Sequence, residues 1–310
     1  NAAMVELKLV WWPQFPTEEF EYHYLPLTAT VGTPRFEYEE APYFQRLLLH
    51  ANAAQVTRKK AVISCLAAAM VHGIPVLNLE RSTRVELNLP GKARPPSGYP
   101  EIFHYRNAYL PESDITVVRG YRVTTVERTF VDICAVNGEL EGLVFLESAL
   151  RRGYTKGRFQ QYLDSNCGRW GISKAQKILA KALYGIDSVY ETFARCLIEE
   201  YFPHLTVEPQ AVFSTPNSYY RVDLLIAGFL ILEIDGWEKY RGSDKQVRAI
   251  YERQIAREQF LSDAGYHVLR VHPDEIASKL LRKIAFLTGH PTLNRHRVLD
   301  LHNQPPWWNK

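Results

Sequence analysis

Cysteine is scarce in this 310-residue sequence, and its four cysteines are scattered. Cys65, Cys134, Cys167 and Cys196 lie far apart, without a CxxC motif or a Cys/His cluster. Zinc sites and disulfide frameworks are recognised by close, regular spacings. The pattern is therefore typical of reduced thiols, most of them buried.

Long apolar runs are missing as well. The longest, 224–232, is far shorter than the ~20 residues that a membrane-spanning helix needs. The first residues show no basic segment followed by an apolar core, which a signal peptide would have. We therefore expect a cytoplasmic protein that has no membrane partner.

Strong net charge is also absent, since the formal charge is +3. Such a small excess identifies no partner, because nucleic-acid-binding proteins are recognised by clustered basic charge. What the chain does have is 46% hydrophobic and 23% charged residues, the mixture of a globular protein. At ~100–200 residues per domain, its length predicts two domains.

The first part of the chain mixes helix and strand patterns. Residues 43–72 predict two short helices, and Gly73 and Pro75 end the second. Residues 83–89 alternate apolar and polar side chains, which predicts a half-buried strand. A strand at 102–105, a hairpin around Arg119-Gly120 and helices from Thr125 and from Leu140 complete a mixed α/β domain at residues 1–154.

Residues 155–184 are helical and basic, with an apolar stripe at helical spacing, and we interpret them as a connector. Ser188 and Glu191 then form a capping box that predicts a helix over 188–201. Strands follow in a β-meander at 205–213, 219–226 and 229–235, then a helix over about 244–264 and a strand at 266–271. The second domain spans 185–290, and 291–310 form a tail.

Three acidic residues on two neighbouring strands are the most informative pattern. Asp223 ends the segment Arg221-Val222-Asp223, and Glu233-Ile234-Asp235-Gly236 follows after nine intervening residues. Side chains alternate along a strand, so Glu233 and Asp235 share a face, and a hairpin brings Asp223 beside them. The sequence therefore predicts three converging carboxylates.

An acidic cluster of this kind is unfavourable unless a cation neutralises it, because like charges repel. Mg²⁺ (or Mn²⁺) fits best, since hard divalent ions bind carboxylate oxygens and keep water ligands. A metal-bound water can attack a phosphodiester. We therefore predict that Asp223, Glu233 and Asp235 bind metal for phosphodiester hydrolysis. Taken singly, each acid is better explained structurally: Asp223 and Asp235 as strand ends beside turns, and Glu233 as a solvent-facing side chain.

Three further residues, Glu191, Lys239 and Gln254, are candidates for the catalytic set. Glu191 could complete the metal shell from its helix, although its place three residues after Ser188 also suits helix capping. Lys239 lies four residues past Asp235, so a turn could return its ammonium group to orient water or to stabilise charge. An ordinary solvated lysine explains Lys239 equally well.

The helix expected over 244–264 and the residues before it carry groups suited to a DNA backbone. Gln254 and Arg257 lie about one helical turn apart and could reach the same phosphate. We expect nucleic-acid contacts from Arg241, Lys245, Arg253 and Arg257. A charge-rich helix is also typical of a solvated surface, so this feature supports a nuclease without establishing one.

Residues 187–275 resemble the PD-(D/E)XK nuclease superfamily, and within it the very-short-patch-repair-like endonucleases. The resemblance rests on Glu191, Arg221-Val222-Asp223, Glu233-Ile234-Asp235-Gly236, a basic helix with Arg253 and Arg257, and Gly265-Tyr266-His267-Val268-Leu269-Arg270-Val271. It implies a restriction-endonuclease-like mixed sheet flanked by helices, in which Asp223 and Glu233 bind Mg²⁺. Asp235 replaces the superfamily's lysine, as is usual in this branch, so the general base stays open.

The amino-terminal domain resembles the AbiEi-type antitoxin and regulator family. The matching stretches are Ser64-Cys65-Leu66-Ala67-Ala68-Ala69-Met70-Val71-His72-Gly73-Ile74-Pro75 and Gly120-Tyr121-Arg122-Val123-Thr124-Thr125-Val126-Glu127-Arg128-Thr129-Phe130-Val131-Asp132. The family's winged-helix DNA-binding region normally precedes them, and residues 1–50 show no such pattern. Thr125, Arg128 and Asp132 lie at helical spacing, which we interpret as a helix cap and an ion pair.

Together these patterns predict an α/β protein in which a smaller mixed domain, for recognition or as a scaffold, precedes a nuclease-like domain. The predicted function is a Mg²⁺-dependent DNA endonuclease; a role in restriction, repair or phage defence is implied by the resemblance alone. The alternative is a non-catalytic DNA-binding or toxin–antitoxin transcriptional regulator with a degenerate nuclease fold. DNA is the expected partner; a homodimer and a protein partner of the amino-terminal domain stay open.

Overall fold

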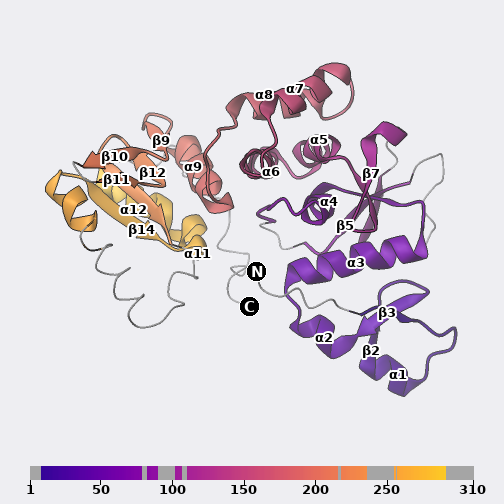
Figure 1. The fold of residues 1–310 in the computed structure, drawn as a ribbon. Coiled ribbons are helices and arrows are strands. Elements are labelled where there is room, and N and C mark those ends of the chain that lie inside the picture. Colours follow the sequence, from indigo (N-terminus) through magenta and orange to yellow (C-terminus); the bar gives the residue numbers. More distant parts are fainter. Residues whose placement is uncertain are drawn as a thin grey trace. The chain divides into compact units, whose positions relative to one another are not determined.

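The computed structural model describes residues 8–78, 82–89, 102–106, 110–215, 218–235, 255 and 257–290. The chain divides into two compact units, Asn1–Ala182 and Leu183–Lys310. Both are mixed α/β structures with mixed or antiparallel sheets (Figure 1). Among the described helices, none has the length and apolar character to cross a membrane.

The first unit begins with a small antiparallel sheet of order β1-β3-β2. Its strands are β1 (Val10–Trp11), β2 (Tyr24–Pro26) and β3 (Val31–Pro34), and it carries α1 (Glu18–His23) and α2 (Arg35–Glu40). The Thr17 hydroxyl caps α1 by accepting the Phe20 N–H at 3.2 Å. Leu27 and Val31 are buried in a core shared with α3 (Tyr43–Thr57).

A five-stranded sheet of order β6-β5-β4-β8-β7 forms the centre of this unit. The strands are β4 (Val62–Ser64), β5 (Val85–Asn88), β6 (Phe103–Arg106), β7 (Ile115–Val118) and β8 (Tyr121–Thr124), with the 3₁₀ turn η1 (Glu112–Asp114) before β7. β5–β6 and β4–β8 pair in parallel; the other pairs are antiparallel. The predicted hairpin turn is confirmed, because Arg119 and Gly120 both have the positive φ that a tight two-residue turn requires.

Three further helices of the first unit are α4 (Cys65–Val71), α5 (Val126–Val136) and α6 (Glu139–Arg151). α4 packs against β4, β5 and β8, and α5 packs against α4 and α6. The prediction of two short helices over 43–72 was wrong in detail, since α3 is long and the buried strand β4 separates it from α4. β4 has three residues and no polar alternation, so it gave no periodic signal.

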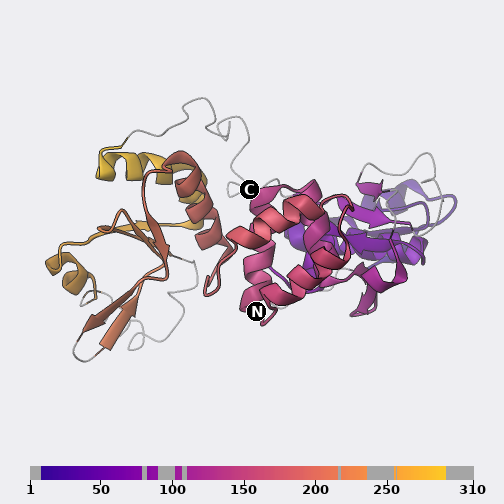
Figure 2. The ribbon, with the colours of Figure 1, turned by 90° about the horizontal axis from the view of Figure 1, so that it is seen from above.

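The helices α7 (Lys156–Ser165) and α8 (Ile172–Lys181) lie outside α5 and α6, at the near surface in the view from above (Figures 1 and 2). The apolar stripe of α8 is buried, as predicted, through Ile172, Ala175, Ile178 and Leu179. A loop separates the two helices, so residues 155–184 are not one continuous helix. Gly171 ends the loop with a φ of +89°.

The second unit holds a four-stranded sheet of order β14-β13-β12-β9. Its strands are β9 (Val207–Pro209), β12 (Leu224–Ile226), β13 (Leu230–Ile234) and β14 (His267–Val271). β13 and β14 pair in parallel, whereas β12 pairs antiparallel with both β13 and β9. The helices are α9 (Val189–Tyr201), helical residues 257–263, α11 (Pro273–Glu275), the π-helical segment Ile276–Leu280 and α12 (Leu281–Thr288).

The predicted strands 205–213 and 219–226 are each broken in two. β10 (Val212–Thr215) and β11 (Ser218–Arg221) leave the main sheet and form a separate antiparallel hairpin. The first break is at Gln210, whose φ is +56° and therefore incompatible with a continuous strand. The second break, at residues 222–223, positions Asp223 immediately before β12.

Candidate functional site

The predicted carboxylates of the second unit come from separate elements. Glu191 lies in the first turn of α9, Asp223 lies between β11 and β12, and Glu233 and Asp235 lie in and just after β13. Leu224 pairs with Leu232 in the antiparallel ladder, so Asp223 and Glu233 extend from its same end. The fold therefore brings Asp223 close to Glu233, as the hairpin pattern predicts.

Glu191 is buried and held through one carboxylate oxygen. The Ser188 hydroxyl accepts the Glu191 backbone N–H at 3.1 Å, which caps α9. Glu191 Oε2 accepts hydrogen bonds from the Asp187 N–H at 3.2 Å and from Gln210 Nε2 at 2.5 Å. Burial, reinforced by the negative charge of Asp223, raises the pKa of Glu191 to about 7. Glu191 thus lies in the capped first turn of α9 and also close to the predicted acidic cluster.

Gln210 connects α9 to the short segment between β11 and β12 that holds Asp223. Besides its side-chain bond to Glu191, its backbone N–H donates to the Asp223 carbonyl at 2.9 Å. Asp223 Oδ2 in turn accepts the Ile234 N–H at 2.8 Å, so this side chain reaches β13. Sequence reasoning missed Gln210, because a single polar residue between two short strands adds nothing to either periodicity.

Arginine side chains balance the charge of the carboxylates of β13. Glu233 forms an ion pair with Arg257, and Arg270 Nη2 lies 3.9 Å from its other oxygen. Arg270 Nε also lies 3.8 Å from Asp235 Oδ2. The parallel register pairs Glu233 directly with Arg270, and this explains the approach. Because Glu233 and Asp235 are buried, these cations offset a large desolvation cost.

The structure brings no complete set of metal ligands together among the described acidic residues. Within the described ranges, no three His, Cys, Asp or Glu side chains are grouped so as to hold a metal ion. Asp223 accepts a backbone N–H, and Glu233 is paired with Arg257. Because Mg²⁺ is usually held by one or two carboxylates together with several waters, this arrangement does not test the predicted site. The Mg²⁺ site stays a prediction.

Five predicted site residues lie outside the described residues: Lys239, Arg241, Lys245, Arg253 and Gln254. Arg257, predicted to contact nucleic acid, is described. Besides its pair with Glu233, its guanidinium donates to the Arg221 carbonyl at 2.8 Å and lies 6.0 Å from the centre of the Tyr220 ring. Arg221 itself pairs with Asp187. These contacts make an arginine-rich edge beside the carboxylates.

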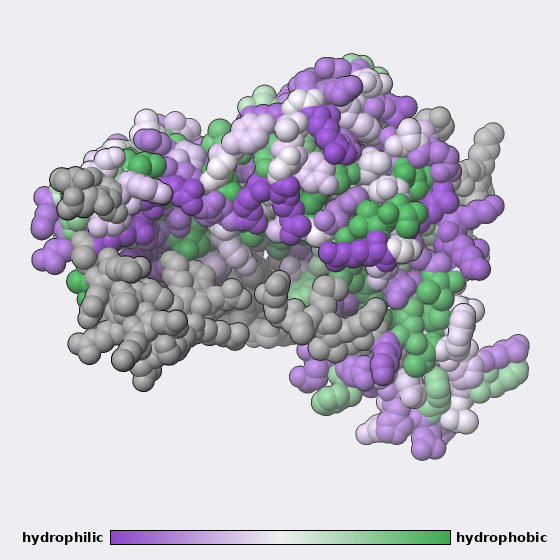
Figure 3. Space-filling model, viewed as in Figure 1, coloured by the Kyte–Doolittle hydropathy of each residue, from purple (hydrophilic) through white to green (hydrophobic). Residues whose placement is uncertain are grey.

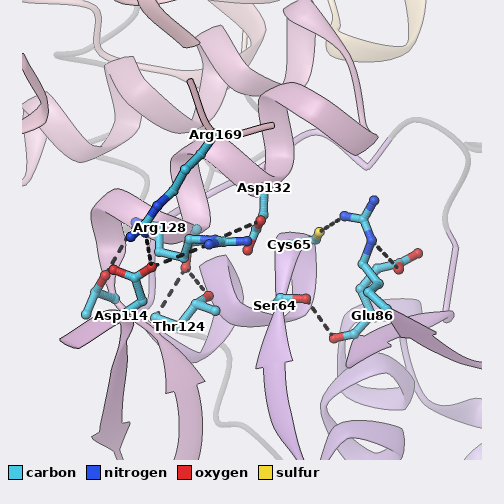
Figure 4. Close-up of polar contacts among 11 residues, drawn as sticks. Ser64, Cys65, Glu86, Asp114, Thr124, Arg128, Asp132 and Arg169 are labelled. Atoms are coloured by element: carbon cyan, nitrogen blue, oxygen red, sulfur yellow. Dashed lines mark hydrogen bonds and ion pairs between the residues drawn. The ribbon is translucent and has the colours of Figure 1, made fainter. Parts of the chain in front are cut away.

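A second group of charged residues, which we call the Arg128 cluster and which consists of Arg128, Asp114 and Asp132, is buried in the first unit (Figure 4). Arg128 Nε donates to Asp132 Oδ1 at 3.0 Å, and Arg128 Nη1 donates to Asp114 Oδ2 at 3.4 Å. Thr125 Oγ1 accepts the Arg128 N–H at 3.4 Å, so the predicted cap and ion pair are confirmed. Burial raises the pKa of Asp132 to about 6, against the opposing effect of Arg128.

Arg106 extends this group toward β5. Its Nη1 lies 3.8 Å from Cys65 Sγ, and its Nε lies 3.9 Å from Glu86 Oε2. A cavity of about 360 Å³ is lined by Cys65 and Glu86. Burial raises the pKa of the Cys65 thiol well above its usual range, which disfavours the thiolate that a nucleophile requires. The guanidinium of Arg106 stacks on the ring of Trp170, 4.7 Å from its centre.

The basic charge of the first unit is concentrated in residues 151–181. This segment carries eight basic residues and one acidic residue, Asp164, a net charge of +7 against +3 for the whole chain. The basic residues are Arg151, Arg152, Lys156, Arg158, Arg169, Lys174, Lys177 and Lys181. Figure 3 shows hydrophilic residues over the position of α7 and α8. We call this exposed part the basic face. The sequence pattern already indicated a basic segment, but interpreting it as a connector gave its charge no functional role.

One lysine stripe runs along α8. Lys174, Lys177 and Lys181 follow each other at three- and four-residue intervals, opposite the buried stripe of the helix, and all three are exposed. Lys181 pairs with Glu139 of α6. The ion pairs of the described residues include neither Lys174 nor Lys177. Two ammonium groups of the basic face thus have no counter-ion among those pairs.

Residues 62–180 match the family model of the AbiEi antitoxin C-terminal domain. The matched range begins at β4 and ends in α8, so it includes the five-stranded sheet, the Arg128 cluster and most of the basic face. This match supports the predicted resemblance of the amino-terminal part. No curated protein matches the chain. The nuclease resemblance of the second unit stays a prediction.

Proposed function

We propose that the protein is a DNA-binding regulator of the toxin–antitoxin kind, and that the basic face of α7 and α8 contacts the DNA backbone. The single observation that carries this proposal is the net charge of +7 in residues 151–181, all but the last of which lie in a segment similar to an antitoxin domain. Clustered basic charge is what attracts phosphates, and it acts independently of DNA sequence.

The charge of the amino-terminal lobe, residues 8–40, favours placing the DNA contact on the basic face. Residues 8–40 carry six glutamates against Lys8 and Arg35, and Arg35 donates to the carbonyls of Glu21, Tyr22 and Tyr24. An acidic lobe repels phosphates. The lobe is therefore not suited to bind DNA in place of a winged-helix region. Within the described part of this unit, the basic face is the better candidate for the DNA-contacting surface.

A charge-reversal experiment tests the regulator. Binding of a fluorescent 30-base-pair duplex by the full chain is measured at several salt concentrations, for wild type and for Lys174→Glu/Lys177→Glu. Each lost phosphate contact reduces the slope of log K against log[salt] by about 0.9, so two lost contacts should flatten it by nearly two. The control, Lys59→Glu/Lys60→Glu, makes the same charge change in the turn after α3. Equal effects of the two variants, or no binding by wild type, would overturn the proposal.

A second candidate function, phosphodiester hydrolysis by the second unit, is favoured by one specific observation. Glu191 and Asp223 are close enough for the charge of one to raise the pKa of the other, and Glu233 extends from the same end of the ladder. Grouped acids with a raised pKa are typical of functional sites, although structural ion-pair networks produce them too. This candidate keeps the second unit as an endonuclease and the first as its DNA-contacting part.

The nuclease candidate is tested by incubating supercoiled, linear and single-stranded DNA with the full chain and Mg²⁺ or Mn²⁺. Asp223→Ala and Glu233→Ala, each checked for folding by circular dichroism, should abolish cleavage. Glu208→Ala removes an exposed acid of the same sheet and should leave it intact. Folded wild-type protein that cuts none of these substrates would reject the endonuclease and leave the regulator as the function.

A further inference from the structure

We infer that Trp170 is a stacking platform for an unpaired base, so that the basic face binds single-stranded nucleic acid as well as duplex. This inference rests on the proposed nucleic-acid contact of the basic face and specifies its substrate. Its starting point is an aromatic side chain that stays 59% exposed at the beginning of the lysine stripe. A single exposed aromatic residue is ordinary, so the inference depends on where this ring lies, next to the basic charge of α8.

The backbone around Trp170 is fixed in place. The loop Cys167 to Gly171 turns through two left-handed glycines, Gly168 and Gly171. A Cβ atom on Gly171 would lie 3.0 Å from both the Ala135 Cβ and a Val131 methyl group, which shows how closely the loop packs on α5. Arg169, immediately before Trp170, pairs with the buried Asp114 at 3.5 Å. Trp170 is therefore presented by an anchored loop.

One contact already orients the indole ring. The guanidinium of Arg106 lies 4.7 Å from the ring centre, within the range of a cation–π interaction. Arg106 is in turn positioned from β6 by Cys65 and Glu86. The ring is thus supported from the protein side, while more than half of its surface remains accessible. An accessible, oriented ring is what a base needs for stacking.

The lysine stripe supplies the other half of a single-strand site. Trp170, Lys174, Lys177 and Lys181 follow one another at intervals of four, three and four residues from the loop into α8. Proteins that bind single strands without sequence preference combine a basic track along the backbone with aromatic rings that stack on bases. In a duplex the bases already stack on one another, so Trp170 should contribute to single-strand binding much more than to duplex binding.

The test compares two probes, a fluorescent 15-nucleotide oligo(dT) and a 15-base-pair duplex, on the full chain. Trp170→Ala should weaken oligo(dT) binding about fivefold or more and change duplex binding less than twofold, and Trp170→Phe should restore most of the lost affinity. Trp11→Ala removes another exposed tryptophan of the first unit, 76% exposed, and should leave both affinities unchanged. Circular dichroism confirms that each variant is folded.

The outcomes separate this inference from the proposed function. Duplex binding that depends on Lys174 and Lys177, together with oligo(dT) binding that ignores Trp170, would overturn the stacking platform and leave the regulator intact. Equal losses for both probes in Trp170→Ala would also overturn it, because the residue would then act through structure. If wild type binds neither probe, the inference and the proposed function fall together.

Discussion

Arg128 and Asp132 form an ion pair one helical turn apart in α5, with 3.0 Å between Nε and Oδ1, and both side chains are almost fully buried. Arg128 also reaches Asp114 of η1 at 3.4 Å. The Arg128 cluster thus joins the helix to the residues that lead into β7. One guanidinium thus pairs with two buried carboxylates, both of which lose their hydration when the protein folds.

Removing Arg128 should therefore be costly. Arg128→Ala leaves Asp114 and Asp132 without this shared partner, and breaking a buried pair in this way typically costs ~3–5 kcal/mol. The free energy of unfolding from urea titrations measures the loss. Arg122→Ala removes an exposed pair with Glu112 and should cost at most ~1 kcal/mol. Similar losses in the two variants would contradict the burial argument.

Glu191 should make stability depend on pH. Its pKa is about 7 in the folded protein, against ~4.3 for an unperturbed glutamate. Because the pKa of Glu191 is raised in the folded protein, its protonated carboxyl stabilises the fold most below pH ~4. This contribution is lost as pH rises through 7, and the free energy of unfolding should then fall by an amount of the order of 3 kcal/mol. Glu191→Gln stays neutral and keeps an acceptor for Gln210, so it should unfold with less pH dependence in this window.

A direct titration checks the same prediction. The carboxyl ¹³C signal that disappears in Glu191→Gln should titrate with a midpoint near pH 7 in the wild-type protein. A Glu191 midpoint near 4 would show that burial and Asp223 do not act on this carboxyl as described.

The loop before α8 should tolerate substitution at one glycine better than at the other. Gly168 and Gly171 both have positive φ, so alanine at either position is strained by ~1–2 kcal/mol. At Gly171 the new methyl group also meets α5, whereas at Gly168 it meets nothing within 4 Å. Gly171→Ala should therefore lower the thermal midpoint more than Gly168→Ala. Equal shifts would show that the contact with α5 adds no cost.

Local patterns in the sequence identified several elements correctly. Thr125 and Ser188 begin α5 and α9 as caps, and Arg119-Gly120 forms the expected hairpin turn. In these cases the deciding interaction lies within four residues along the chain. The apolar stripe of α8 is a further example, because helical periodicity states which face is buried.

Interactions between distant residues were not predictable in the same way. Arg270 lies beside Glu233 only because β14 pairs in parallel with β13, and no local pattern specifies that register. Gln210 adopts a left-handed conformation that its residue type does not indicate, so the break between β9 and β10 could not be read from the sequence. The same limit applies to the candidate site, where arginines and a glutamine contact the predicted acids.

The parallel pairing of β13 with β14 also constrains when the second unit can fold during synthesis. β13 is buried along Leu230, Ile231 and Leu232, and its neighbour β14 ends at Val271. Until the ribosome has released that residue, one edge of β13 exposes unpaired backbone groups, which invite pairing with other chains. A nascent chain that pauses between β13 and β14 should therefore need chaperone protection more than one that pauses after Val271.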